Sequence, residues 1–476
     1  MMQDYEMVIG LEVHVELKTQ TKIFCGCSTK FGAPPNTQCC PVCTGMPGSL
    51  PVLNGQVVEY AVMAGLATGC EIASYSKQDR KNYFYPDLPK AYQISQYDLP
   101  LCARGHLDIE TESGTKRIGI TRIHIEEDAG KLTHVEGKGT LIDCNRCGVP
   151  LIEIVSEPDM RSAEEAKAYL QKLRAIILYT GVSDGKMNEG SFRCDVNLSI
   201  RKKGSDTLGT RTEMKNLNSF QSVVRAIEYE FARQVSVLDE GGEVIQETRR
   251  FDMNTGKTSA MRSKENADDY RYFPDPDLVP VIVSEEMKQT LARKIPTLPD
   301  ERKQQYREKY NLSSLTAETL VMRKDIADYF ETVAADTGYP VLAANLVAGE
   351  IARLCPEEQA IPVAPEHLAV LADLLGQGKI NGGTAKKVVA QLMQEDQDPV
   401  ALIKSQGLQQ ISDESVLLPM AKEVLAQNEK AVADYRGGNK NAFHALVGQM
   451  MKKTQGKGNP QMIQQVLKAL LEDVSE

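Results

Sequence analysis

The spacing of apolar residues changes once along this chain, at Pro296-Thr-Leu-Pro299. Before that boundary, apolar and polar residues alternate in several segments, which is the pattern of half-buried strands. We expect strands at residues 5–18, 117–126, 141–145, 151–155 and 192–200. After it, apolar residues recur every three or four positions, as in amphipathic helices. A run of strands followed by a run of helices favours an α+β protein with separate domains.

Helix signals refine this division. Within the strand-rich part, one helix should begin at the capping box Ser162-Ala-Glu-Glu165 and another after Ser219. Further helices are expected at residues 325–335, 343–354, 365–375, 384–394, 441–453 and 461–471. Asn459 can cap the last of them and Pro460 can occupy its first position. We predict a β-rich domain at residues 1–293, a helical domain at 294–405 and a small helical tail at 406–476.

Composition excludes some classes of protein. The net charge is -10, with 55 basic and 65 acidic residues, which argues against a surface covered in nucleic acid but allows a local basic patch. The N-terminus lacks the features of a signal peptide, and no apolar run approaches the ~20 residues of a membrane span. We therefore expect a cytoplasmic protein with no membrane partner. In that reducing compartment, clustered cysteines are more often metal ligands than disulfides.

Cysteine spacing is the most specific single signal. Two close pairs can surround one zinc ion in a closed structural site, although small unligated core cysteines would also fit. The four residues are Cys25, Cys27, Cys40 and Cys43. Cys39 is an alternative to Cys40, but the Cys-x-x-Cys spacing favours Cys40. Cys144 and Cys147 have the same spacing without a second pair nearby, so they stay unassigned.

Acidic and histidine side chains gather on the expected strands. In Glu12-Val-His14-Val-Glu16 the polar residues share one face, which fits a sheet with one side in water, or a metal or phosphate site. Residues 126–128 are three consecutive acids, and they repel one another unless solvent or a cation neutralises them. Glu153 interrupts an apolar strand, where a carboxylate is costly to bury unless it is paired or coordinated. We expect Glu153 to be functional.

Basic residues could hold phosphate groups in two regions. Residues 79–96 interleave aromatic and basic side chains around prolines, so this loop can present Lys81 and Lys90 to phosphate or carboxylate, unless its tyrosines merely pack it. In the tail, basic residues flank a glycine-bearing loop before a helix, which suits RNA phosphates or a solvated helix end. These tail residues are Lys452, Lys453 and Lys457.

Familiar catalytic signatures are absent from the sequence. Gly256-Lys257-Thr258 looks like the end of a phosphate loop, but Phe251 stands where the first glycine should be. No Ser-Lys amidase or Cys-His glutaminase signature occurs either. If the chain uses ATP, it does so through an unusual site, and if it uses ammonia, another protein must supply it.

Longer motifs resemble those of the B subunits of tRNA-dependent amidotransferases. The longest is Asp143-x-Asn-Arg-x-Gly-x-Pro-Leu-Ile-Glu-Ile-Val-Ser-x-Pro158. Shorter blocks at residues 9–17, 79–86, 90–96 and 268–274 follow the family's order. Residues 448–460 are similar to a tail module that the family shares with small YqeY-type proteins. The resemblance covers nearly the whole chain.

The resemblance implies a fold and an activity. The fold would be a β-rich cradle domain, a helical domain and a YqeY-like tail that contacts tRNA. The chain would work in a heterotrimer with an amidase A subunit and a small C subunit, as an ATP-dependent carbon–nitrogen ligase with glutamine as amido donor. It would phosphorylate the side-chain carboxylate of Glu-tRNA(Gln) or Asp-tRNA(Asn), and ammonia would then displace the phosphate. Which of the two tRNAs is the substrate stays open.

The resemblance also implies site residues. The metal and ATP shell would comprise Glu12, His14, Glu127 and Glu153, with Glu126 as a close alternate. Magnesium would be held by His14, Glu127 and Glu153, although a histidine ligand implies tolerance of manganese or a water-mediated contact. Phosphate, ATP or the ammonia route would involve Lys81, Lys90 and Arg146. The competing interpretation is a zinc-containing RNA-binding protein without catalysis, which would not cleave ATP with any charged tRNA.

Overall fold

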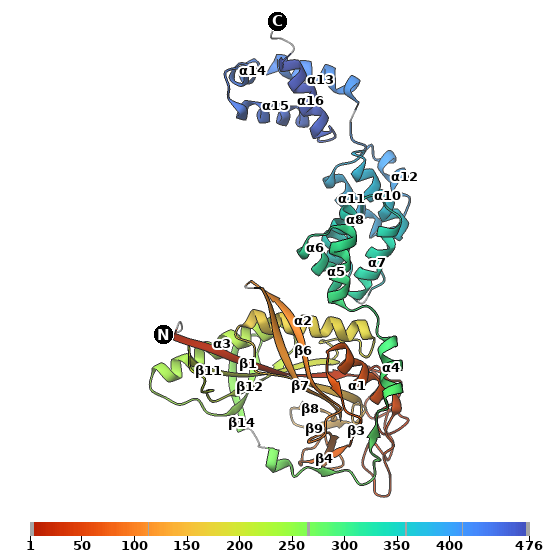
Figure 1. The fold of residues 1–476 in the computed structure, drawn as a ribbon, viewed down its shortest axis with the longest axis vertical. Helices are drawn as coiled ribbons and strands as arrows, with labels where there is room; N and C mark the ends of the chain where they lie inside the picture. The colour runs from red at the N-terminus through yellow and green to blue at the C-terminus, as the bar shows by residue number, and fades with distance from the viewer. Residues whose placement is uncertain (1–3, 113, 264–266, 358, 412, 473–476) are drawn as a thin grey trace. The chain divides into compact units, whose positions relative to one another are not determined.

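The computed structural model describes residues 4–472 except 113, 264–266, 358 and 412. The chain separates into two compact units, Met1–Pro299 and Asp300–Glu476. All the named strands belong to the first unit, and the elements of the second are helical (Figure 1). The expected α+β class, strands first and helices after, is therefore confirmed. The finer three-domain boundaries stay a prediction.

A nine-stranded sheet is the framework of the first unit. Its strand order is β14-β13-β12-β11-β1-β10-β7-β6-β2, and every pairing is antiparallel except β12 with β13. The strands are β1 (Tyr5–Glu16), β2 (Glu71–Ile72), β6 (Cys102–Thr111), β7 (Gly114–Glu127), β10 (Pro150–Ser156), β11 (Phe192–Lys202), β12 (Thr212–Leu217), β13 (Glu247–Asp252) and β14 (Lys257–Ser263).

Three smaller sheets accompany it. They pair β15 (Phe273–Pro274) with β4 (Asp79–Asn82) and β5 (Tyr92–Ser95), β16 (Val281–Ile282) with β3 (Tyr75–Ser76), and β8 (Lys131–Val135) with β9 (Gly139–Asp143). The strand expected at residues 141–145 is β9, which begins at Gly139 and ends at Asp143. It ends there because a turn follows, in which the Cys147 amide donates to the Cys144 carbonyl.

Helices cover one face of the large sheet. The unit's helices are α1 (Gly55–Ala67), α2 (Ala163–Thr180), α3 (Phe220–Asp239) and α4 (Glu285–Lys294), and α2 and α3 lie along that face in Figure 1. Val13 and Val15 of β1 are fully buried in one core with Tyr169 and Leu173 of α2. Because side chains alternate along a strand, the polar residues that alternate with these valines face away from the helices.

Local signals set the helix starts as expected. Ser162 accepts a hydrogen bond from the Glu165 amide, and Ser219 accepts one from the Ser222 amide. The capping box differs in one detail. The Glu165 carboxylate accepts from the Arg161 amide, one residue before the cap, rather than from the amide of Ser162.

A buried ion network joins α3 to strands β12–β14. The Glu230 side chain is fully buried, with its carboxylate 2.6 Å from Arg233 and 3.3 Å from Arg249. Thr212 of β12 and Thr258 of β14 also donate to it. Burial alone would raise the pKa of Glu230, but these partners, Arg233 first, lower it. The network fixes the outer strands of the sheet, whose other face carries part of the site.

The second unit is built from amphipathic helices. They are α5 (Pro299–Tyr310), α6 (Ser314–Val321), α7 (Lys324–Ala335), α8 (Pro340–Leu346), α9 (Ala352–Leu354), α10 (Pro365–Gly376), α11 (Gly382–Leu392), α12 (Pro399–Ser405), α13 (Glu414–Gln427), α14 (Glu429–Arg436), α15 (Lys440–Lys453) and α16 (Pro460–Glu472). A π-helical turn, Val347–Ile351, interrupts the helix expected at residues 343–354. Asn459 accepts from the Gln461 amide and so caps α16, as the sequence predicts.

Within the described residues, no helix combines the length and apolar character that crossing a membrane would require.

Candidate active site and cysteine cluster

The sheet face that points away from the helices carries a row of charged side chains. Four neighbouring strands, β7, β10, β1 and β11, place one residue each at matching register. The row consists of His124, Glu153, His14 and Arg193. The Glu153 carboxylate therefore lies between two histidines, and an arginine follows on the next strand.

Glu126, two residues after His124 on β7, joins Glu153 and the two histidines of this row in a tight cluster. The Nε2 atom of His14 lies 3.3 Å from Oε1 of Glu126 and 3.7 Å from Oε2 of Glu153. The Nε2 atom of His124 lies 3.2 Å from the same Glu153 oxygen. The Glu126 side chain is only 4% exposed and that of Glu153 13%. Carboxylates buried this deeply need positive charge beside them.

The electrostatics of this cluster favour a bound cation. Burial by itself lowers the pKa of His14, but Glu126 and Glu153 outweigh it and raise that pKa to about 9. Burial raises the pKa of Glu153, yet His124 and His14 bring it down to about 2. Donor atoms of His14, Glu126 and Glu153 all lie within 4.8 Å of one another. Their nitrogen and oxygen donors fit a divalent ion, which would replace the charge that protonated His14 supplies.

A second acidic group lies beside the first on the same face. Glu12, Asp195 and Glu213 also bring carboxylate oxygens within 4.8 Å of one another. Here Lys215 provides the compensating charge, with its Nζ 2.5 Å from Asp195 and 3.3 Å from Glu213. Asn197 donates to Glu12 at 2.8 Å. All-oxygen groups of this kind suit hard cations or the ammonium of a lysine.

Both groups line one cavity of about 800 Å³, which we call the sheet cavity. Lys81 of β4 also lines it, with Nζ 4.6 Å from the centre of the Tyr270 ring. Among the described residues, Lys81 forms no ion pair within 4 Å. Burial lowers the pKa of Lys81, but Tyr272 and the negative charges of Glu126 and Glu153 raise it overall. Lys81 is therefore an ammonium available to a ligand.

Arg146 lines the same cavity but is engaged by the protein itself. Its guanidinium donates to the carbonyls of Ala129 and Gly130, each at 2.9 Å, and lies 3.3 Å from Asp128. Arg193 binds the same Asp128 at 2.9 Å. These contacts hold the loop after β7 against the cavity wall. Arg146 therefore has a structural role, whether or not it also binds a ligand.

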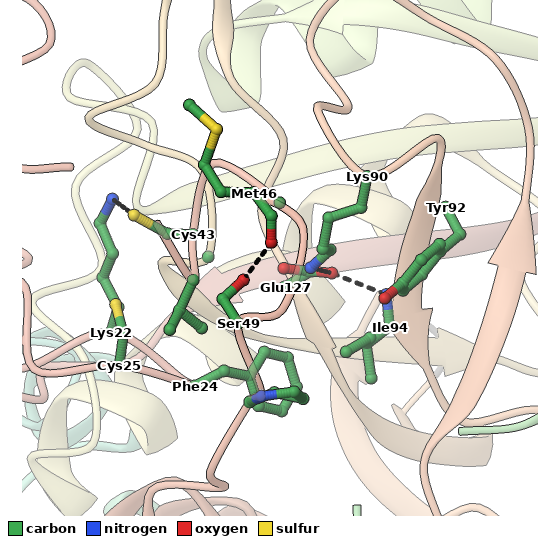
Figure 2. Close-up of a pocket in the computed structure, with 14 residues that line it drawn as sticks. Lys22, Phe24, Cys25, Cys43, Met46, Ser49, Lys90, Tyr92, Ile94 and Glu127 are labelled. Carbon is green, nitrogen blue, oxygen red and sulfur yellow. Dashed lines mark hydrogen bonds and ion pairs between the residues drawn. The ribbon is translucent and has the colours of Figure 1, made fainter. Parts of the chain in front are cut away.

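Glu127 is not part of this cluster. Its carboxylate forms an ion pair with Lys90 and accepts from the Ile94 amide at 2.8 Å (Figure 2). Both charged residues line a separate, smaller pocket of about 140 Å³, together with Phe24 and Cys43. The metal shell expected from the sequence named Glu127, but Glu126 is the residue that the structure places beside His14 and Glu153.

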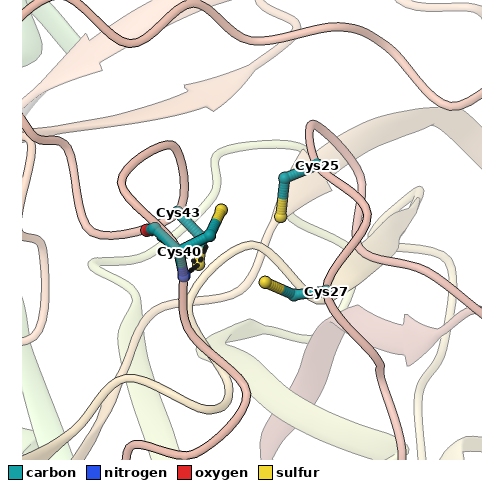
Figure 3. A group of neighbouring side chains, drawn as sticks. All are labelled: Cys25, Cys27, Cys40 and Cys43. Atoms are coloured by element: carbon teal, nitrogen blue, oxygen red, sulfur yellow. Dashed lines mark hydrogen bonds between the residues drawn. The ribbon is translucent and has the colours of Figure 1, made fainter.

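The four cysteines predicted to bind zinc converge (Figure 3). The four sulfur atoms of Cys25, Cys27, Cys40 and Cys43 lie within 4.8 Å of one another, and those of Cys40 and Cys43 are 3.9 Å apart. A tetrahedral zinc site with ordinary Zn–S bonds has sulfur separations of about 3.8 Å. Cys39, the alternative ligand, instead points its thiol toward Asn145 at 3.7 Å.

The remaining sequence-predicted residues lie in the tail. Lys453 pairs with Glu423 of α13 at 2.5 Å, whereas the exposed Lys452 beside it has no ion pair with a described residue. Lys457 follows in the turn between α15 and α16, where Gln455 and Gly456 adopt positive φ angles. The three lysines thus border one turn directly before the N-terminus of α16.

Comparisons with known proteins place the chain in a family. A model described as "GatB/GatE catalytic domain" matches residues 7–289, and one described as "GatB domain" matches residues 328–471. A protein of Caldicellulosiruptor saccharolyticus, named as the B subunit of an aspartyl/glutamyl-tRNA(Asn/Gln) amidotransferase, is 56% identical over 99% of this chain and 100% of its own length. Proteins of the same name from Caldanaerobacter subterraneus and Geobacter sulfurreducens are 54% and 53% identical, each over 98% of both chains.

The chain belongs to the GatB family of amidotransferase B subunits. In this GatB-family chain, the residues matched by the catalytic-domain model include all those that line the sheet cavity. They also include the four clustered cysteines. The second match includes the tail and its lysines.

Sequence reasoning missed several cavity residues of this GatB-family protein. Asp195 and Arg193 lie on a strand that the sequence predicts, and their alternation with apolar Cys194 and Val196 was the available signal. Glu213 and Lys215 of β12 had no comparable signal, because that strand is short and was not predicted. Only the sheet pairing brings them beside Glu12.

Proposed function

We propose that the chain is the phosphorylating subunit of a glutamine-dependent, tRNA-dependent amidotransferase. It would use ATP to phosphorylate the side-chain carboxylate of Glu-tRNA(Gln) or Asp-tRNA(Asn), giving Gln-tRNA(Gln) or Asn-tRNA(Asn) after amidation. One observation carries this proposal: His14, Glu126 and Glu153 bring their donor atoms within 4.8 Å of one another in the cavity that Lys81 also lines. The names of the curated relatives, which refer to these tRNAs, support it.

The chemistry explains why such a site is needed. A carboxylate is a poor acyl donor, because its leaving group would be oxide. In the proposed reaction a carboxylate oxygen attacks the γ-phosphorus of ATP and ADP leaves. Ammonia then attacks the carbonyl carbon, and inorganic phosphate leaves as a proton is lost from nitrogen. Phosphoryl transfer depends on positioning and charge neutralisation more than on covalent help from the protein.

The residues divide this work between them. His14, Glu126 and Glu153 would hold a divalent ion, magnesium or the more nitrogen-tolerant manganese. When bound, that ion supplies charge neutralisation for the phosphate oxygens. Lys81 would bind a phosphate oxygen within the same cavity, and Glu12 would complete the acidic wall.

Ammonia would come from a partner. We propose a heterotrimer with an amidase A subunit and a small C subunit, working in the cytoplasm. The pocket that holds Lys90 and Glu127 is a suitable entrance, because Gln93 lines the sheet cavity and donates to the Glu127 carbonyl at 2.7 Å. Lys90 and Glu127 would therefore line the ammonia route rather than contact ATP.

The cysteine cluster would hold structural zinc next to this entrance. We expect one zinc ion per chain, lost in Cys40→Ser and in Cys43→Ser but retained in Cys39→Ser, because only the Cys39 thiol points away from the cluster. Elemental analysis of the purified variants measures this directly. Loss of the zinc ion should also lower the melting temperature of the protein, since structural zinc contributes to folding. Loss of zinc in Cys39→Ser with retention in Cys40→Ser would overturn the ligand set.

Adjacent glutamates give a matched test of the proposed metal group. Glu126→Gln and Glu153→Gln should lower tRNA-dependent ATP cleavage on the order of 100-fold or more, because each removes a carboxylate from the cation site. Glu127→Gln should lower it far less, since Glu127 faces Lys90. ADP release by the assembled complex is the measurement, with the partner's glutamine hydrolysis as control. Equal losses in all three variants would contradict the assignment.

The tail should bind tRNA through its lysine turn. Residues 406–476 hold eight basic and eight acidic residues, so local clustering rather than net charge must attract RNA. Lys452→Ala/Lys453→Ala/Lys457→Ala should weaken tRNA binding and reduce the log–log salt slope by up to about 1 per lost phosphate contact. The control Lys422→Ala/Lys430→Ala/Lys440→Ala removes the same charge elsewhere in the tail. Filter binding across a salt series that gave both triple variants the same slope would refute the site.

A further inference from the structure

Two tyrosines from distant parts of the chain stack on each other in the lining of the sheet cavity. The rings of Tyr97 and Tyr272 are 4.3 Å apart, with only 6° between their planes. Both residues line the cavity, and Tyr97 remains 41% exposed. A ring that serves only the core would be buried, so this pair presents an aromatic surface to the cavity and its solvent.

The backbone around Tyr272 is strained in a way that keeps this surface in place. Arg271 has a φ of 47°, a left-handed conformation that few residues other than glycine adopt. The Asn82 side chain holds this turn by donating to the Arg271 carbonyl at 2.8 Å. Tyr270 and Tyr272, on either side of Arg271, therefore both line the cavity. Strained backbone of this kind is enriched at active sites and ligand-binding sites.

A guanidinium lies beside the tyrosine pair. Arg122 of β7 lines the same cavity, and its Nη1 donates to the Tyr97 carbonyl at 3.5 Å. Among the described residues it forms no ion pair within 4 Å, unlike Arg193, which binds Asp128. The proposed phosphoryl-transfer reaction makes no use of it. An unpaired guanidinium next to an exposed aromatic surface is the combination that binds a base together with its phosphate.

We infer that Tyr97, Tyr272 and Arg122 form a subsite for an adenosine nucleotide, with the base stacked on the Tyr97 ring and a phosphate on Arg122. This inference rests on the proposed function, because both substrates of that reaction carry adenosine: ATP itself, and the 3′-terminal nucleotide of the tRNA. The shared chemistry is an adenine ring with an adjacent phosphate. The binding test below distinguishes ATP from the tRNA 3′ end as the source of the adenosine.

The chain contains no tryptophan, which allows a clean binding test. Tyr97→Trp keeps a stacking ring and introduces a single tryptophan, whose emission a stacked adenine quenches. The full chain is titrated with Mg-ATP and, separately, with an RNA hairpin that carries a tRNA acceptor stem and its 3′ CCA end. Quenching by ATP alone assigns the subsite to ATP, and quenching by the hairpin alone assigns it to the tRNA end. Quenching by both supports a subsite for adenosine of either origin.

The matched control is Tyr75→Trp, at a tyrosine 48% exposed on β3 that does not line the sheet cavity. It should show no quenching by either probe. If neither probe quenches Tyr97→Trp, or if both tryptophans respond equally, the inference is wrong.

Kinetics of the assembled complex provide the second measurement. Tyr97→Leu should raise the KM of the substrate that quenches by roughly 5- to 100-fold, because it removes the stacking. Arg122→Gln should raise the same KM, because it removes the phosphate contact, and Tyr75→Leu should leave it unchanged. Unchanged KM values for both ATP and charged tRNA in Tyr97→Leu would overturn the subsite and leave the proposed function intact. Absence of ATP-dependent amidation in the wild-type complex would instead overturn the proposed function.

Discussion

The site depends on the alternation of side chains along β1. Val13 and Val15 pack into the core beneath α2, and this burial fixes the register of the strand. The same register turns Glu12 and His14 to the opposite face. A shift by one residue would place carboxylates in the core at a cost of several kcal/mol each. Hydrophobic burial on one face of the sheet thus positions the charged groups on the other.

Charge balance then shapes the polar face. Neighbouring strands set histidine beside the buried carboxylates of the first group, and Lys215 compensates the second acidic group. In the absence of a ligand, protonated His14 compensates Glu126 and Glu153. In the proposed function a divalent ion would take over that role. Lys81 and Arg122 remain as positive charges available to phosphate groups.

Sequence patterns predicted much of this structure, for identifiable reasons. The alternation in β1, the cap at Ser162 and the paired cysteines are local signals, and the structure agrees with each. The choice between Glu126 and Glu127 was missed because the expected strand ended at residue 126, whereas β7 continues through Glu127. Alternation along β7 then puts Glu126 on the same face as His124 and Glu127 on the opposite face with Ile125. The stacking of Tyr97 on Tyr272 joins segments too distant in sequence for any periodicity to reveal.

The central claim is that the charged face of the sheet activates a carboxylate by phosphorylation. The most direct test is whether an oxygen atom of the substrate carboxylate is transferred to inorganic phosphate. Mischarged tRNA whose glutamate or aspartate side-chain carboxylate carries ¹⁸O is amidated by the chain assembled with its partner subunits, and the released inorganic phosphate is analysed by mass spectrometry. We predict that each phosphate carries one oxygen from the carboxylate. Amidation with phosphate free of ¹⁸O would contradict this claim.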